Sequence, residues 1–189
     1  MPGRDDDLAL LIEAARLAGR IALRYWKRNP KTWEKGDEGP VTEADIAVND
    51  ALAHLLRSAR PGYGWLSEET PDTAARLECE HVFILDPIDG TRAFIAGEDS
   101  FSHAIAIARH GQVTAGVVFL PALDRLFAAT ETGPATLNGA PIHASTLPGI
   151  AGANILTPAA NLKPEFWPGG VPEVTRSFRA SVAYRLALV

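Results

Sequence analysis

The segment HVFILDPIDGTRAF, residues 81–94, carries the most informative pattern in the sequence. Four apolar residues, VFIL, have the pattern of a buried strand and run directly into Asp86, and Asp89 follows three positions later. Pro87 has a fixed φ and no N–H, so it predicts an immediate turn at the end of this strand. Both carboxylates can then converge beyond the strand. Paired carboxylates and a backbone carbonyl supply the oxygen ligands that hard divalent cations need.

The residues after Asp89 add a second feature. Gly90 and Thr91 open the segment GTRAFIAG, which we expect to be helical. N–H groups at a helix start favour anions, so metal and phosphate can meet at one turn. A lone D-x-x-D pair is more often a turn or an N-cap. Phosphatases that form an aspartyl-phosphate carry D-x-D-G-T, but Pro87 stands at the position of the nucleophile. The residues therefore favour metal-activated water over a covalent mechanism.

Two amphipathic helices are predicted before this motif. Apolar residues recur at three- and four-residue steps over residues 8–25, and a second periodic segment follows Thr42. Thr42 fits an N-cap, with Asp45 three residues later as in a capping box. Pro61 and Gly62 end the second helix.

Short apolar runs indicate strands in the rest of the chain. The predicted strands are GYGWLSEE, HVFILD, SHAIAIAR, QVTAGVVFL, LFAAT and ANIL. A hairpin is expected at His110-Gly111 and a turn at Asn138-Gly139, and SVAYRLALV has the pattern of a helix start. This order predicts an α+β architecture, with an N-terminal metal- and phosphate-binding domain over 1–148 and a partial C-terminal α/β domain over 149–189.

Composition limits the classes of function. The chain has 189 residues, 47% of them hydrophobic, and a net charge of −5 without a basic block, which argues against a nucleic-acid partner. Its single cysteine excludes an internal disulfide and a thiolate metal site. The five histidines lack ligand spacing and are expected to be structural or exposed. No apolar run approaches a membrane span, and MPGRDDDLAL is acidic where a signal peptide is basic, so we expect a soluble cytoplasmic protein without a membrane partner.

Three blocks together resemble the inositol monophosphatase superfamily of magnesium-dependent, lithium-sensitive phosphatases. LDPIDGTRAF resembles its central metal and phosphate motif, WLSEET its upstream glutamate motif and GPVTEAD its N-terminal motif, in the family's order and spacing. The resemblance covers nearly the whole chain and implies a layered α/β/α/β/α sandwich of the sugar-phosphatase type. GVVFLPALDRLFAA is most similar to the 3′(2′),5′-bisphosphate nucleotidase branch, with the inositol monophosphatases proper a near second.

The resemblance also implies roles for individual residues. Glu68, Asp86 and the backbone carbonyl of Ile88 would ligate magnesium, and Asp86 would bridge to a further ion that Asp89 also binds, with two or three ions per site. Thr91 and Asp45 would position and deprotonate the attacking water, and Glu68 would share in catalysis. The phosphate and substrate contacts would come from Ile88, Asp89, Gly90, Thr91, Ala180 and Ser181.

Each role has a structural alternative. Asp45 can be no more than the acid of a capping box, and Thr91 no more than an N-cap hydroxyl. Glu68 and Glu69 can be a solvated strand end, and Arg92 is expected to face solvent. Lys35 falls near a lysine in the family's N-terminal loop, with no assigned role.

The sequence departs from the family pattern toward its C-terminus. The family has one more metal-binding aspartate, usually after a tryptophan, and none of the four tryptophans here precedes Asp. We therefore expect a C-terminally incomplete chain whose second metal site lacks one carboxylate. The predicted function is magnesium-dependent hydrolysis of adenosine 3′,5′-bisphosphate or inositol monophosphate. A histidinol-phosphate phosphatase and a non-catalytic metal- and phosphate-binding remnant stay open, and a homodimer is implied by resemblance only.

Overall fold

A computed structural model describes residues 4–36 and 39–189. The start of the acidic N-terminal stretch, residues 1–3, and residues 37–38 of the predicted polar loop lie outside the described residues. In chain order the elements are α1 (Arg4–Tyr25), β1 (Thr32–Glu34), β2 (Pro40–Thr42), α2 (Glu43–Ala59), β3 (Gly64–Ser67), β4 (His81–Asp89), α3 (Thr91–Ile95), β5 (Ser102–Arg109), β6 (Gln112–Leu120), β7 (Arg125–Thr130), β8 (Thr136–Leu137), β9 (Ala140–Pro141), β10 (Asn154–Leu156), β11 (Thr175–Ser177) and α4 (Val182–Ala187). Within the described ranges, no helix has the length and apolar character to cross a membrane.

A seven-stranded sheet in the order β3-β4-β5-β6-β7-β8-β9 forms the centre of the molecule. β3 and β4 pair in parallel, and every later neighbour pairs antiparallel. The predicted turns at His110-Gly111 and Asn138-Gly139 are confirmed, and all four residues have positive φ, as tight hairpin turns require. The α+β class is therefore confirmed.

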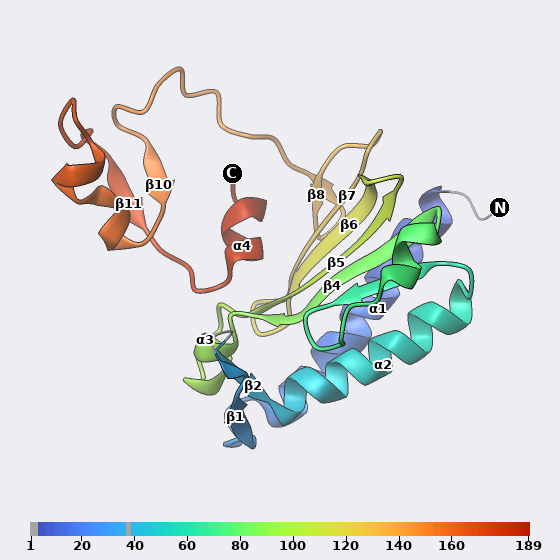
Figure 1. The fold of residues 1–189 in the computed structure, drawn as a ribbon. Helices are drawn as coiled ribbons and strands as arrows, with labels where there is room; N and C mark the ends of the chain where they lie inside the picture. The colour runs from blue at the N-terminus through green and yellow to red at the C-terminus, as the bar shows by residue number, and fades with distance from the viewer. Residues whose placement is uncertain (1–3, 37–38) are drawn as a thin grey trace.

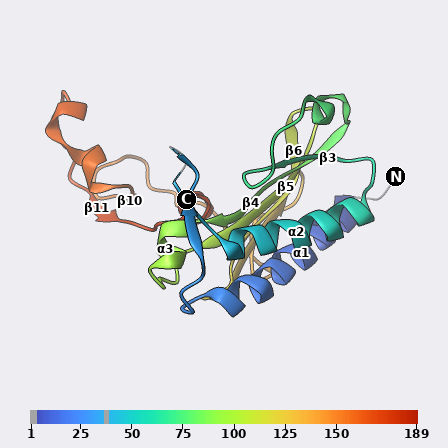
Figure 2. The same cartoon turned by 60° about the horizontal axis from the view of Figure 1, so that its bottom comes forward.

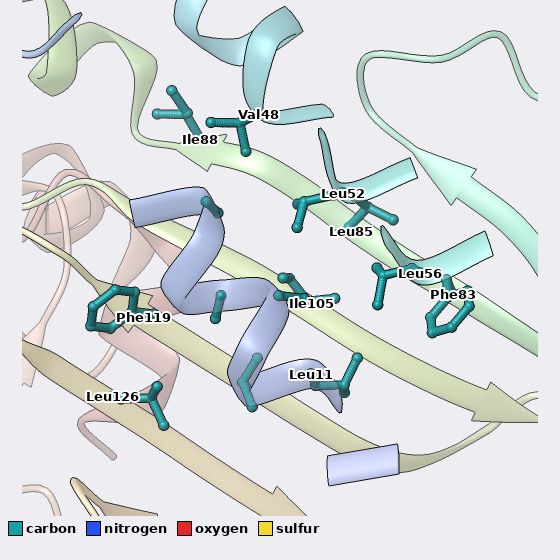
Figure 3. Packing of buried hydrophobic residues seen from close by; sticks show 14 of the residues in the cluster. Leu11, Val48, Leu52, Leu56, Phe83, Leu85, Ile88, Ile105, Phe119 and Leu126 are labelled. Atoms are coloured by element: carbon teal, nitrogen blue, oxygen red, sulfur yellow. The ribbon is translucent and has the colours of Figure 1, made fainter. Parts of the chain in front are cut away.

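α1 and α2 lie side by side across one face of this sheet (Figures 1 and 2). Figure 3 shows Leu11 of α1 and Leu52 and Leu56 of α2 pointing toward Phe83 and Ile105 of the sheet. All five side chains are almost completely buried. Burial of one such side chain contributes about 1.5–3 kcal/mol, so this layer contributes strongly to stability.

The opposite face of the sheet receives the last helix, α4. Tyr184 of α4 is buried against Leu120 and Phe127, and its hydroxyl accepts a hydrogen bond of 2.7 Å from Arg125 Nη1. β10 and β11 form a separate parallel pair that is not hydrogen-bonded to the large sheet (Figure 1). The predicted C-terminal region thus contains one pair of strands away from the sheet and one helix that packs on it. The boundary at 148/149 stays a prediction.

β4 differs from the sequence-based expectation. The sequence predicted a turn at Pro87, and this prediction is wrong. The chain continues as a strand to Asp89. Asp86 pairs with Ala104 and Asp89 with Ser102, so three steps along β4 match two steps along β5. This register shift is a β-bulge, and a bulge tolerates a proline within a sheet because the ladder is already interrupted there.

Candidate active site

Three acidic side chains lie around the carboxyl ends of β3 and β4. Glu68 directly follows β3, and its N–H donates to Leu85 O of β4 at 3.3 Å. Burial, and then the nearby carboxylates of Glu68 and Asp89, raise the pKa of Asp86 well above its usual range. A buried carboxyl group among like charges needs a proton or a cation as its counter-charge. The structure therefore brings the three predicted acids into one electrostatic neighbourhood.

The chemistry of these oxygens fits a hard divalent cation. Among the described residues, however, no group of three or more His, Cys, Asp or Glu side chains is arranged to hold a metal ion. Asp89 Oδ2 accepts hydrogen bonds from Ser181 Oγ at 2.5 Å and from Ala183 N at 2.7 Å. The metal-binding roles of Glu68, Asp86, Ile88 and Asp89 stay predictions.

Thr91 connects the bulge to α2. Its Oγ1 donates to the carbonyl of Ile88 at 3.0 Å and lies 3.5 Å from Asp45 Oδ1. Gly90 precedes it with φ 93°, a conformation that glycine adopts without strain. The predicted helix over GTRAFIAG is the short α3, and the exposed Arg92 faces solvent as expected.

Asp45 is both the capping acid and a neighbour of the site. Its Oδ2 accepts hydrogen bonds from Thr42 N at 2.8 Å and Thr42 Oγ1 at 2.6 Å, which completes the predicted capping box. Burial raises the pKa of Asp45 to about 6; Glu69 adds to the rise and the hydrogen bonds from Thr42 oppose it. A carboxyl group with a pKa near neutrality is suited to general-base work.

Ser181 joins the C-terminal segment to this site. Because its proton goes to Asp89 Oδ2, Ser181 Oγ accepts a hydrogen bond from Ser102 Oγ at 2.9 Å and from Tyr184 N at 2.8 Å. A Cβ on Gly90 would lie 3.3 Å from Ser181 N. The structure thus places Ser181 and the preceding Ala180 beside the motif, although 92 residues separate Asp89 from Ser181.

Two further residues belong to this neighbourhood. Lys35 Nζ donates to Glu68 O at 2.9 Å and forms an ion pair of 2.6 Å with Glu69 Oε2. His103 Nδ1 donates to the carbonyl of Pro87. From the sequence, Lys35 has no assigned role, and His103 is one of five histidines that are expected to be structural or exposed. No local spacing connects either residue to its partner.

The model of the inositol monophosphatase family matches residues 4–166. An inositol-1-monophosphatase from Mesorhizobium japonicum is 37% identical over 133 residues, which is 69% of this chain and 50% of that protein. A histidinol-phosphatase from Chlorobaculum parvum is 34% identical over 142 residues, or 75% of this chain and 54% of that protein.

Solved structures agree with this match. The extragenic suppressor protein suhB from Bartonella henselae superposes with a TM-score of 0.80 at 27% identity, covering 95% of this chain and 72% of that chain. The predicted sandwich fold is therefore confirmed. The chain spans about half the length of the curated relatives it matches. With a family model that covers most of its length, this chain belongs to the inositol monophosphatase family.

Proposed function

We propose that this chain carries the catalytic region of a magnesium-dependent phosphomonoesterase. The observation that supports this most strongly is the gathering of Glu68, Asp86 and Asp89 beside the Thr91–Asp45 pair. Carboxylate oxygens are the ligands that magnesium prefers, and a hydroxyl next to a buried carboxylate can take part in proton transfer. Membership of the family supports the same reaction class.

Each residue has a defined task in this proposal. Glu68, Asp86, Asp89 and the Ile88 carbonyl would hold magnesium, which would supply positive charge near the phosphoryl oxygens and make a water molecule more acidic. The attacking water gives a proton to the Thr91 hydroxyl, and that hydroxyl passes its own proton from its hydrogen bond with the Ile88 carbonyl to Asp45 Oδ1, which lies 3.5 Å away.

The phosphate and the rest of the substrate have separate contacts in this proposal. The N–H groups of Gly90 and Thr91 hold phosphate oxygens, while Ala180 and Ser181 contact the rest of the substrate. Positioning and electrostatics then supply most of the rate enhancement. The enzyme needs no covalent intermediate.

The proposed substrate is a small phosphorylated metabolite, either adenosine 3′,5′-bisphosphate or inositol monophosphate. The similarity to an inositol-1-monophosphatase supports the second of these. Histidinol phosphate is a further candidate, supported by the similarity to a histidinol-phosphatase. We include lithium sensitivity, two or three magnesium ions per site and a cytoplasmic location in the proposal.

Phosphate release from the three candidate substrates tests this proposal. The protein is assayed with and without magnesium, beside its Asp86→Asn variant. We expect magnesium-dependent release from at least one substrate and roughly a 100-fold loss in the variant. Magnesium and phosphate binding without turnover, measured by calorimetry, would establish the non-catalytic alternative instead. If Asp86→Asn leaves magnesium affinity unchanged, the metal site is elsewhere and the proposal fails.

A further inference from the structure

The two aspartates of the motif share a face of the sheet only because β4 contains a bulge. In a regular strand, residues three positions apart point to opposite faces. Here Asp86 pairs with Ala104 and Asp89 with Ser102. Ala104 and Ser102 are two positions apart on β5 and share a face, and paired residues point to the same side. The bulge therefore directs Asp86 and Asp89 to one side of the sheet.

His103 is the residue of β5 that lies opposite the bulge. It stands between Ser102 and Ala104, while Pro87 and Ile88 stand between the two aspartates. Its Nδ1 donates a hydrogen bond to the Pro87 carbonyl. This bond fixes one of the two bulge carbonyls from the side of β5. Thr91 Oγ1 holds the other, the carbonyl of Ile88, at 3.0 Å. Side chains thus satisfy the carbonyls of both bulge residues.

The surroundings of the imidazole are unusual for a histidine, because the ring is buried and one of its nitrogens is unpaired among the described residues. Its side chain is fully buried next to Phe101 and Phe119. Nε2 has no hydrogen-bond partner in the part of the chain that the structure describes. An unpaired buried polar atom lowers stability, and a buried apolar side chain at this position would avoid that cost. The Nδ1 hydrogen bond to the bulge explains why a histidine is placed here.

We propose that His103 is a positioning residue: by holding the Pro87 carbonyl, it fixes the bulge that orients Asp86 and Asp89 toward a divalent cation. This inference rests on the proposed function for the identity of the ligand, but the bulge and its hydrogen bond stand independently. His103 touches neither the cation nor the substrate. It acts through the backbone between the two carboxylates.

Two variants separate this role from core packing. His103→Asn keeps an N–H donor at the position of Nδ1 but leaves a cavity, whereas His103→Phe fills the space and removes the donor. If His103 served only core packing, the Phe variant would be the more stable of the two, because it leaves no cavity. The positioning role predicts the opposite order for magnesium affinity, measured by calorimetry. We expect Asn to stay within about threefold of the original protein and Phe to lose roughly tenfold or more.

Two controls complete the experiment. His81→Phe changes a histidine at the other end of β4, and it should leave magnesium affinity unchanged. Amide hydrogen exchange over residues 86–91 gives a readout that needs no metal, and we expect faster exchange in His103→Phe than in His103→Asn. If magnesium binding is weaker and exchange is faster in His103→Asn than in His103→Phe, or if neither measurement changes, the positioning role is overturned. If the original protein binds no magnesium, the proposed function fails, and exchange alone decides the role of His103.

Discussion

Oδ1 of Asp45 lies 3.5 Å from the hydroxyl oxygen of Thr91, while Oδ2 of the same carboxylate accepts two hydrogen bonds from Thr42. One side chain therefore closes the first turn of α2 and presents its other carboxylate oxygen to the start of α3. The capping and catalytic interpretations of Asp45 are compatible, because each uses a different oxygen. The cap also fixes the direction in which Oδ1 points.

Asp45→Asn should separate the two roles. An Asn side chain can still accept a hydrogen bond from Thr42 N, so we expect a stability loss of about 1 kcal/mol. It cannot act as a base, so the rate of phosphate release should fall by roughly 100-fold or more. Urea denaturation and steady-state kinetics measure the two effects. The matched control is Thr42→Ala, which removes the cap hydroxyl and should cost about 1–2 kcal/mol with a much smaller change in rate. Equal losses of rate in both variants would mean that Asp45 acts only through the helix start.

Gly90→Ala should loosen the contact between the motif and α4. Gly90 has φ 93°, and a Cβ there would lie 3.3 Å from Ser181 N. Backbone strain at positive φ costs about 1 kcal/mol or more. Gly111, with φ 79° and nothing within 4 Å of its Cβ position, provides a control that has the strain without the contact. We expect faster amide exchange over residues 182–187 only in Gly90→Ala, and the same exchange in both variants would contradict this.

Much of the fold could be predicted because local signals dominated it. The capping box at Thr42, the apolar period of α1 and the glycine turns of the hairpins each specify structure within a few residues. Such signals act through the backbone and need no knowledge of distant neighbours. Local motifs and family resemblance also predicted the acids of the candidate site, and their roles stay predictions.

The features that the sequence did not predict from local patterns depend on contacts between distant segments. The bulge in β4 follows from pairing with Ser102 and Ala104, which the sequence of β4 does not contain. Sequence reasoning therefore predicted a turn at Pro87 where the strand continues. The hydrogen bond from Ser181 to Asp89 joins residues 92 positions apart, and only resemblance suggested that they meet. Register and long-range polar contacts are tertiary features that no local pattern specifies.

Gly19→Ala should destabilise the protein although alanine is the better helix former. A Cβ at Gly19 would lie 2.6 Å from Phe119 Cε1 and 2.9 Å from Pro121 Cβ, so α1 must move away from the sheet. The gain in helix propensity is about 1 kcal/mol, whereas overpacking costs about 1–3 kcal/mol. We expect a net loss of about 1 kcal/mol in urea denaturation. Gly62→Ala, with nothing within 4 Å of its Cβ position, should change stability by much less. A stabilised Gly19→Ala protein would show that α1 and β6 can separate without cost.

His103 should make folding stability depend on pH. Complete burial lowers its pKa from 6.5 to about 4, and the hydrogen bond to Pro87 only partly opposes this. The unfolded chain therefore binds a proton at His103 more readily than the folded protein does. The contribution of the neutral imidazole to the free energy of unfolding is present above pH 6.5 and is lost as pH falls toward 4. Between pH 7 and pH 5 the loss should be about 2 kcal/mol.

His103→Asn isolates this contribution because asparagine does not titrate. The carboxyl groups of the site are the same in both proteins, so their effect on pH dependence cancels in the comparison. Urea denaturation of both proteins at pH 7, 6 and 5 should show a free energy of unfolding that falls more steeply for the original protein. The difference in free energy between the two should shrink by about 2 kcal/mol over this range. Parallel pH profiles would mean that His103 keeps an ordinary pKa in the folded protein, and that its imidazole is not held neutral by burial.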